Sequence, residues 1–181
     1  WYTAQCPLID GDLAVLAPGG RDLLLGVDCR SGQIMWRTPN PHGWQMSHSS
    51  IIPATLGGRR QFVYTAVGGM AGVAADGPDR GSVLWETTEW NHTVVAPSPV
   101  PLPDGRIFVT AGYGVGSRMF QVSEVDGRLS IRSLYTLDRK TFACEQQTPV
   151  YYRDRLFGIL PADAGAQKQQ LVCLRPDGTV E

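Results

Sequence analysis

The residue types best suited to binding chemistry gather in three short segments of the chain. All three histidines and two of the five tryptophans lie in residues 41–48 and 89–92, and a pair of glutamines lies in 142–147. Imidazole and indole rings in one loop suit stacking on a sugar ring or contact with a protein partner, and neutral imidazole also binds metal ions. The candidate residues for ligand or partner binding are His42, Trp44, His48, Trp90, His92, Gln146 and Gln147.

Each of these residues also has an interpretation that needs no ligand. His48 precedes two serines and is equally suited to bonding backbone groups at the start of a strand. Trp44 and Trp90 suit rim positions that cover a core, and the glutamine pair suits a water-filled channel. A metal site made from His48 and His92 has no short-range ligand pair to support it. We therefore predict no catalytic, cofactor-binding or metal-ligating residue.

Familiar catalytic and phosphate-binding motifs find no support in the sequence. Residues 47–49 read Ser-His-Ser without a carboxylate tied to them, so they are no catalytic triad. Glycines alternate in residues 111–117, but no helix is predicted to follow, and a hairpin loop explains the run better than a phosphate cradle.

The cysteines are too far apart in the sequence to suggest a zinc ribbon or a redox dithiol. We expect all four to be small buried hydrophobic residues in strands, and a disulfide stays open if the protein is exported. They are Cys6, Cys29, Cys144 and Cys173.

The composition indicates a globular, turn-rich chain. Of its 181 residues, 16 are basic and 17 acidic, 43% are apolar, 21 are glycine and 13 are proline. The apolar share suffices for a packed core. Near-neutral charge without a basic cluster predicts no nucleic-acid partner, and the interrupted apolar runs predict no membrane-spanning segment.

The elements that would position the candidate residues repeat four times. The repeats open alike at Cys6, Ser50, Ser98 and Thr148, and each opening precedes a turn and three further β-rich runs. A period of about 40–50 residues with four short strands is typical of a propeller blade, and no window keeps the hydrophobic period of a helix. We predict an all-β propeller of four-stranded antiparallel blades, about four of them here, near residues 1–38, 46–88, 96–136 and 145–181.

A glycine opens the last run of each repeat, and in the first two repeats a tryptophan follows four residues later. The glycine suits a turn position with positive φ. The tryptophans are expected to pack the outer strand against a neighbouring blade rather than to hold a cofactor. These structural residues are Gly32, Trp36, Gly81, Trp85, Gly127 and Gly178. The fourth repeat stops before the matching tryptophan, so we expect a seven- or eight-bladed ring completed by remaining blades of the parent chain.

Residues Gly26–Trp36 resemble the blade repeat of the pyrroloquinoline-quinone-like (PQQ-like) propeller family. That repeat typically reads Ala-x-Asp-x-x-Thr-Gly-x-x-x-Trp. Asp28, Gly32 and Trp36 match it, and a serine takes the place of the threonine. The second repeat keeps its glycine and tryptophan, and the later repeats keep Asp-Gly. The resemblance implies a fold related to the quinoprotein alcohol dehydrogenases and to the outer-membrane assembly lipoprotein of Gram-negative bacteria.

The resemblance implies one of two functions. Quinoprotein members bind PQQ and calcium at the ring centre and commonly carry an adjacent cysteine pair, a tryptophan floor and carboxylate or amide calcium ligands, none of which we can match here. Other members bind no quinone and act as protein-interaction platforms. We therefore expect a non-catalytic scaffold in a bacterial periplasmic or secreted protein, which binds a protein or carbohydrate partner on its inter-blade loop face. The alternative is a PQQ-dependent dehydrogenase.

Overall fold

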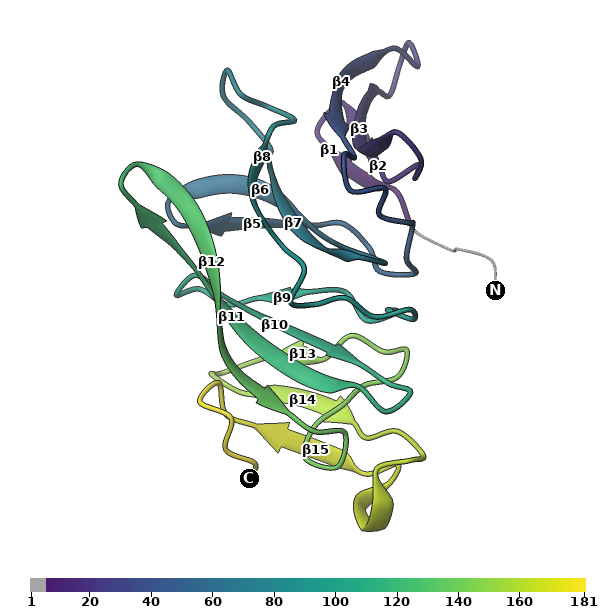
Figure 1. Ribbon diagram of the computed structural model, residues 1–181, viewed down its shortest axis with the longest axis vertical. Coiled ribbons are helices and arrows are strands. Elements are labelled where there is room, and N and C mark those ends of the chain that lie inside the picture. The colour runs from purple at the N-terminus through teal and green to yellow at the C-terminus, as the bar shows by residue number, and fades with distance from the viewer. Residues whose placement is uncertain (1–5) are drawn as a thin grey trace.

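The computed structural model describes residues 6–181 and shows four antiparallel β-sheets that follow one another along the chain (Figure 1). In every sheet the strands pair in their sequence order, as expected when short turns join consecutive strands. The one helix among the described residues is a single 3-10 turn, η1 (Gly165–Gln167). The predicted all-β class with propeller-like antiparallel blades is confirmed.

The strands of the first two sheets are β1 (Leu8–Asp10), β2 (Leu13–Leu16), β3 (Asp22–Asp28), β4 (Ile34–Pro39), β5 (Ile52–Leu56), β6 (Arg59–Ala66), β7 (Gly69–Ala74) and β8 (Val83–Thr87). Those of the third and fourth are β9 (Val100–Pro101), β10 (Arg106–Ala111), β11 (Gly116–Val125), β12 (Arg128–Leu137), β13 (Val150–Tyr151), β14 (Leu156–Ile159) and β15 (Leu171–Leu174). We call β1, β5, β9 and β13 the inner strands, and β4, β8 and β12 the outer strands.

The fourth sheet has three strands, which differs from the expected four. Residues 178–181 of its last run form only an isolated bridge between Leu174 and Val180. The third sheet has a longer last strand than expected, because β12 has 10 residues and continues to Leu137 where the repeat predicts a short strand. Asp126 and Gly127 both have positive φ, 52° and 76°, as a two-residue hairpin turn requires, and this turn lets β11 and β12 pair over their whole length.

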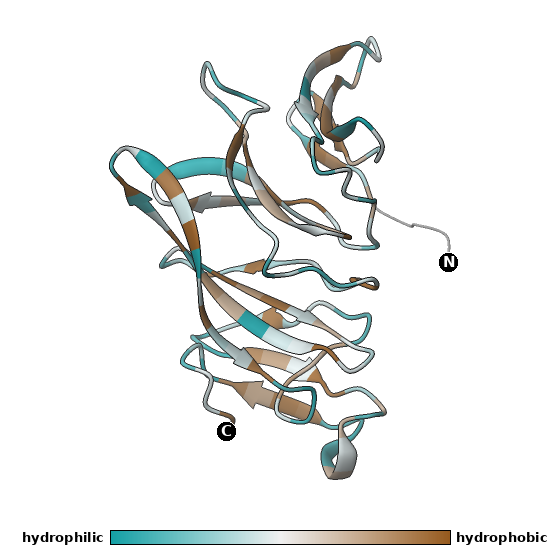
Figure 2. Ribbon diagram, in the orientation of Figure 1, coloured by the Kyte–Doolittle hydropathy of each residue, from teal (hydrophilic) through white to brown (hydrophobic). Residues whose placement is uncertain are grey.

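The hydrophobic core is divided among the spaces between neighbouring sheets. Three clusters of buried side chains fill these spaces, centred on Phe62 between the first and second sheets, Phe120 between the second and third, and Phe108 between the third and fourth. Both faces of a middle sheet are thereby covered, which is why β6 is buried at every position from Gln61 to Ala66 rather than at alternate ones. Figure 2 shows the hydrophobic residues mainly along the strands.

A glycine and a tryptophan form a cross-strand pair in each of the first two sheets. Gly26 lies opposite Trp36, and Gly72 lies opposite Trp85. A Cβ atom added to Gly26 would lie 2.1 Å from the Trp36 ring, so the indole lies directly on the glycine backbone. Trp36 also stacks on Phe62 of the second sheet, with ring centroids 6.0 Å apart. The first of these outer-strand tryptophans therefore joins two sheets.

The cysteines are unpaired and only partly buried. Cys144 is fully buried, Cys173 is half-buried, and Cys6 and Cys29 are exposed, so the expectation of burial is wrong for three of the four. The expectation that they lie in strands holds only for Cys173, on β15. Cys29 lies in the turn after β3, where the chain leaves the core. The glycine run at 112–115 forms the hairpin loop between β10 and β11, as predicted.

Candidate functional site

A depression of about 400 Å³ opens where the connection from the first to the second sheet meets the end of β8. It is lined by His42, Trp44, Glu86, Thr87, Thr88, Glu89 and Ile131. Its walls therefore come from the second and third sheets and from the connections that follow β4 and β8. It is bounded by the outer strands β8 and β12, and not by the inner strands.

His42 is held between a carboxylate and an indole ring. Its Nε2 lies 2.8 Å from Oε1 of Glu86, a residue 44 positions later in the chain, and the two side chains are 44% and 42% exposed. The imidazole stacks on Trp44 with ring centroids 5.3 Å apart. The pair is thus positioned from both sides and still open to solvent.

Trp44 forms the buried floor beneath His42. Its backbone N–H donates to Oδ1 of Asn40 at 3.0 Å, and Nδ2 of Asn40 donates back to the Trp44 carbonyl at 2.8 Å. Its ring rests on the backbone of Gly68 and Gly69, where an added Cβ atom would lie 2.4 and 2.3 Å away. Only 7% of Trp44 is exposed, so it supports His42 from below and presents little ring surface to solvent.

A second aromatic pair lies next to this depression. Trp90 is 2% exposed, and its ring meets His92 edge to face with centroids 4.5 Å apart. Arg118 on β11 donates to the backbone oxygen of Glu89 at 2.8 Å and pairs with its Oε2 at 3.1 Å. Burial lowers the pKa of His92, and the nearby Arg118 cation lowers it further. His92 is therefore favoured in its neutral form.

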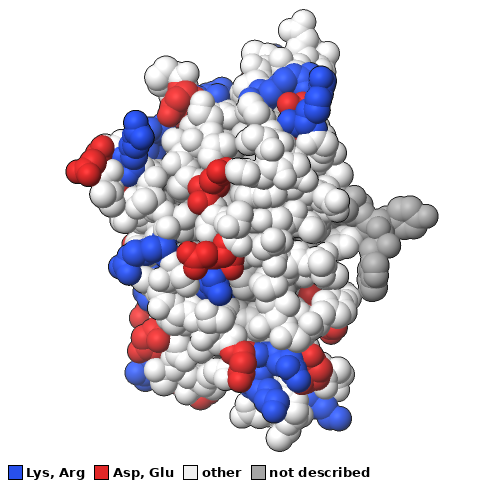
Figure 3. Space-filling model, viewed as in Figure 1, with Lys and Arg blue, Asp and Glu red and all other residues white. Residues whose placement is uncertain are grey.

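The electrostatic balance of the depression is acidic. It presents the carboxylates of Glu86 and Glu89. Arg118 pairs with Glu89, whereas no Arg or Lys of the described residues pairs with Glu86. A cationic group placed beside Glu86 would meet an attractive field. Elsewhere on the visible surface, acidic and basic side chains are interspersed without a broad area of one sign (Figure 3).

The structure brings together some of the sequence-derived candidates and separates others. His42 contacts Trp44, and Trp90 contacts His92. His48 is half-buried and donates its backbone N–H to the Val95 oxygen at 3.1 Å. In the next connection, Gln147 donates from Nε2 to the Ile159 oxygen at 2.7 Å, and the exposed Gln146 donates its backbone N–H to Gln147. Of the seven candidates, only His42 and Trp44 line the depression.

Sequence reasoning missed the acidic half of the site. Glu86 directly follows Trp85 on an outer strand, and Glu89 directly precedes Trp90. A charged residue directly after the buried Trp85 is a local signal that Glu86 faces solvent. Nothing local indicates that it meets a histidine from another connection.

Within residues 6–181, no group of three or more His, Cys, Asp or Glu side chains is arranged to hold a metal ion. No helix in this described part is long and apolar enough to cross a membrane.

Comparisons with known proteins give matches among solved structures and none among sequences. No protein-family sequence model matches the chain. No curated protein matches it in sequence. A crystal structure of a protein of unknown function from Bacteroides caccae is similar, with a TM-score of 0.49 and 15% sequence identity. The match covers 92% of this chain and 55% of that one, so the chain spans little more than half of that protein's length.

Proposed function

We propose that this chain forms a non-catalytic binding scaffold of the PQQ-like propeller type, which binds a protein partner at the depression around His42 and Glu86. The observation that carries the proposal is the exposed His42–Glu86 pair, joined at 2.8 Å across the boundary between two sheets. A rigid sheet array presenting polar groups from loops is a common arrangement for recognition sites.

A protein partner fits this site better than a carbohydrate. Sugars stack on aromatic rings that are open to solvent, and the two tryptophans of the site are only 7% and 2% exposed. The exposed groups are instead a histidine, two carboxylates and the hydroxyl of Thr88. These suit the side chains and backbone groups of a polypeptide.

The assignment to the PQQ-like type rests on the Asp28, Gly32 and Trp36 pattern together with the antiparallel sheets in sequence order. The same resemblance supports the proposal of a bacterial periplasmic or secreted protein. It also supports the rival proposal, a PQQ-dependent dehydrogenase, whose quinone and calcium ligands would have to come from outside the residues described.

The test is a selection with the purified protein against a displayed library of random peptides and a glycan array. We expect peptide ligands whose binding is lost in a His42→Ala/Glu86→Gln double variant. The control variant is Arg30→Ala, in the turn before β4, where the side chain is 83% exposed and does not line the depression, which lies beyond the other end of that strand. It should bind the same peptides unchanged.

Other results would overturn the proposal. Glycan ligands that depend on His42 and Glu86 would make the partner a carbohydrate. Stoichiometric binding of PQQ in the presence of calcium, followed by absorbance, would favour the dehydrogenase. Peptide ligands that bind the double variant as well as the wild type would move the site elsewhere.

A further inference from the structure

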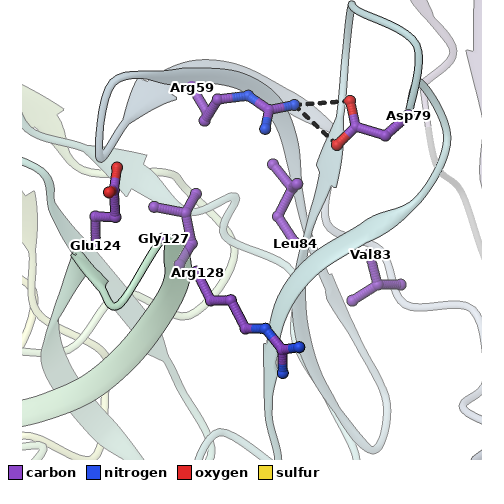
Figure 4. A pocket seen from close by; sticks show the side chains of 8 residues that line it. Arg59, Asp79, Val83, Leu84, Glu124, Gly127 and Arg128 are labelled. Carbon is purple, nitrogen blue, oxygen red and sulfur yellow. Dashed lines mark hydrogen bonds and ion pairs between the residues drawn. The ribbon is translucent and has the colours of Figure 1, made fainter.

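The depression around His42 continues into a groove that separates the second and third sheets at their outer strands. A second hollow, of about 340 Å³, lies between β8 and β12 and includes Val83 and Leu84 on one side and Arg128 and Leu129 on the other (Figure 4). The first hollow is bounded by Glu86 to Thr88 and by Ile131, which follow Leu84 and Leu129 by two residues along the same two segments. The two hollows are therefore successive stretches of one groove.

The direction of the two strands follows from the same residues. The start of β8 faces the start of β12 in the second hollow, and the end of β8 faces Ile131 in the first. Both strands thus run from the Arg128 end of the groove to the Glu86 end.

The floor of the groove is apolar and is held in place by packing on the core. Leu84, Leu129 and Ile131 are half-buried and pack against the core cluster between the second and third sheets. Leu129 also lies against Gly57, where an added Cβ atom would come within 2.4 Å of its Cδ2. Val83 adds a side chain that is 38% exposed at the groove edge. Such a floor accepts small apolar side chains.

Both walls end in backbone that no other strand of the described structure covers. β8 and β12 are the last strands of their sheets and each pairs on one side only, with β7 and β11. An edge strand offers N–H and C=O groups to an extended peptide. The five residues of β8 would pair with a segment about 16 Å long, at about 3.3 Å per residue.

The two ends of the groove differ in charge. At one end lie Glu86 and Glu89, and at the other lies Arg128. The described structure shows no ion pair or hydrogen bond of the Arg128 guanidinium. The second guanidinium at that end, on Arg59, is held by both oxygens of Asp79 at 2.8 and 2.9 Å. Glu124 also lines this end, but Figure 4 shows its carboxylate pointing away from the Arg128 guanidinium.

We propose that the groove binds an extended segment of the partner protein as an added strand antiparallel to β8. The segment carries a basic residue near its N-terminal end beside Glu86 and Glu89, small apolar residues over the leucines, and an acidic residue beside Arg128. Antiparallel pairing is the more stable arrangement, and it sets the order of the charges because β8 runs toward Glu86. This inference rests on the proposed function and adds the chemistry and direction of the ligand.

The test uses short synthetic peptides and fluorescence anisotropy. The probe is a labelled, end-blocked peptide that reads lysine, valine, threonine, valine, threonine, aspartate. We expect it to bind at least about tenfold more tightly than the same residues in reverse order, since only one direction matches both charged ends. Alternate backbone N–H groups of an extended peptide point to opposite edges, so two methylated probes can be made. Methylating the nitrogens that face β8 should abolish binding, and methylating those on the opposite edge should leave it unchanged.

Protein variants test the same contacts from the other side. We expect the affinity for the probe to fall by about tenfold in the double variant Glu86→Gln/Glu89→Gln and, separately, in Arg128→Ala. The Arg30→Ala control should bind it unchanged. A probe in which lysine is replaced by the neutral glutamine should lose no further affinity on the two glutamate substitutions.

The outcomes separate this inference from the proposed function. If library-selected peptides depend on His42 and Glu86 but tolerate Arg128→Ala and backbone methylation, the scaffold function stands and the added-strand arrangement is wrong. Equal affinity for the forward and reversed probes would also overturn the arrangement. If no selected peptide depends on His42 and Glu86, the proposed function itself is wrong.

Discussion

The backbone N–H of Ser98 donates a hydrogen bond to Oγ1 of Thr148, 2.9 Å away and 50 residues later. The same bond occurs one repeat earlier, where the N–H of Ser50 donates to Oγ of Ser98 at 3.0 Å over 48 residues. Each of these residues precedes an inner strand. The hydroxyl residue at the start of a repeat is therefore a link between consecutive sheets, which explains why a serine or threonine recurs there.

Removing one of these hydroxyls should weaken the contact between the third and fourth sheets. Thr148→Ala leaves the Ser98 N–H without its acceptor, and we expect the free energy of unfolding to fall by about 0.5–1.5 kcal/mol. Thr148→Ser keeps the hydroxyl and should behave like the wild type. Urea unfolding of the three proteins measures the difference. Identical midpoints for the alanine and serine variants would show that the bond contributes nothing.

The close contact between Gly72 and Trp85 predicts a strong steric penalty. A Cβ atom at Gly72 would lie 2.3 Å from Nε1 of Trp85 and 2.2 Å from Oε1 of Gln61, and both neighbours are buried. We expect Gly72→Ala to destabilise the protein by about 1–3 kcal/mol through overpacking. The measurement is thermal or urea unfolding.

A double-mutant cycle identifies the ring as the cause. Trp85→Phe removes part of the indole that meets the new methyl group, so Gly72→Ala should cost less in that background than in the wild type. If the losses in free energy of unfolding of the two single variants simply add in the double variant, the glycine is required for another reason.

His92 should make stability depend on pH. Because its pKa in the folded protein lies below the ordinary value of 6.5, the unfolded chain takes up a proton more readily than the native state. The stability is therefore fully present above about pH 6.5 and falls as the pH drops below it, until the native His92 is protonated as well. Urea unfolding measures the free energy of unfolding at about pH 8 and about pH 5. Its decrease between these two pH values should be smaller for His92→Gln than for the wild type. An equal loss in both proteins would assign the pH dependence to other groups.

The four cysteines should differ in reactivity. Burial raises the pKa of the Cys144 thiol to about 12, so almost no thiolate is present near neutral pH. Iodoacetamide at about pH 8 should modify the exposed Cys6 and Cys29 in the native protein and leave Cys144 unmodified until urea is added. Peptide mapping by mass spectrometry locates each adduct. Rapid native labelling of Cys144 would show that its core opens locally.

The fold was predictable because its signals are local. A turn of glycine or aspartate follows each short run, and a strand that reverses through a short turn pairs with its predecessor. The glycine and tryptophan of a repeat lie opposite each other for the same reason, as Gly26 and Trp36 do. The length of β12 escaped prediction, because the alternation of polar and apolar residues over 128–132 is interrupted at Ser133 and Leu134, where the pairing with β11 shifts register.

The candidate site was predictable only in part. The sequence placed histidines and tryptophans in the connections between sheets, and those connections do contribute to the depression. It did not show that Trp44 and Trp90 are buried, because a loop tryptophan has the same local sequence whether it covers a core or faces solvent. Burial depends on Gly68, Gly69 and the neighbouring sheets, which only the fold brings together.

By itself, then, the sequence determined the repeated antiparallel sheets and the connections that carry the rings, since both follow from interactions between residues close along the chain. The tertiary structure decided that His42 meets Glu86 and that β8 and β12 border a common groove. These contacts join residues 44 or more positions apart, and their geometry depends on how one sheet packs on the next. That packing is set by the whole core between the sheets, and no short stretch of sequence contains it.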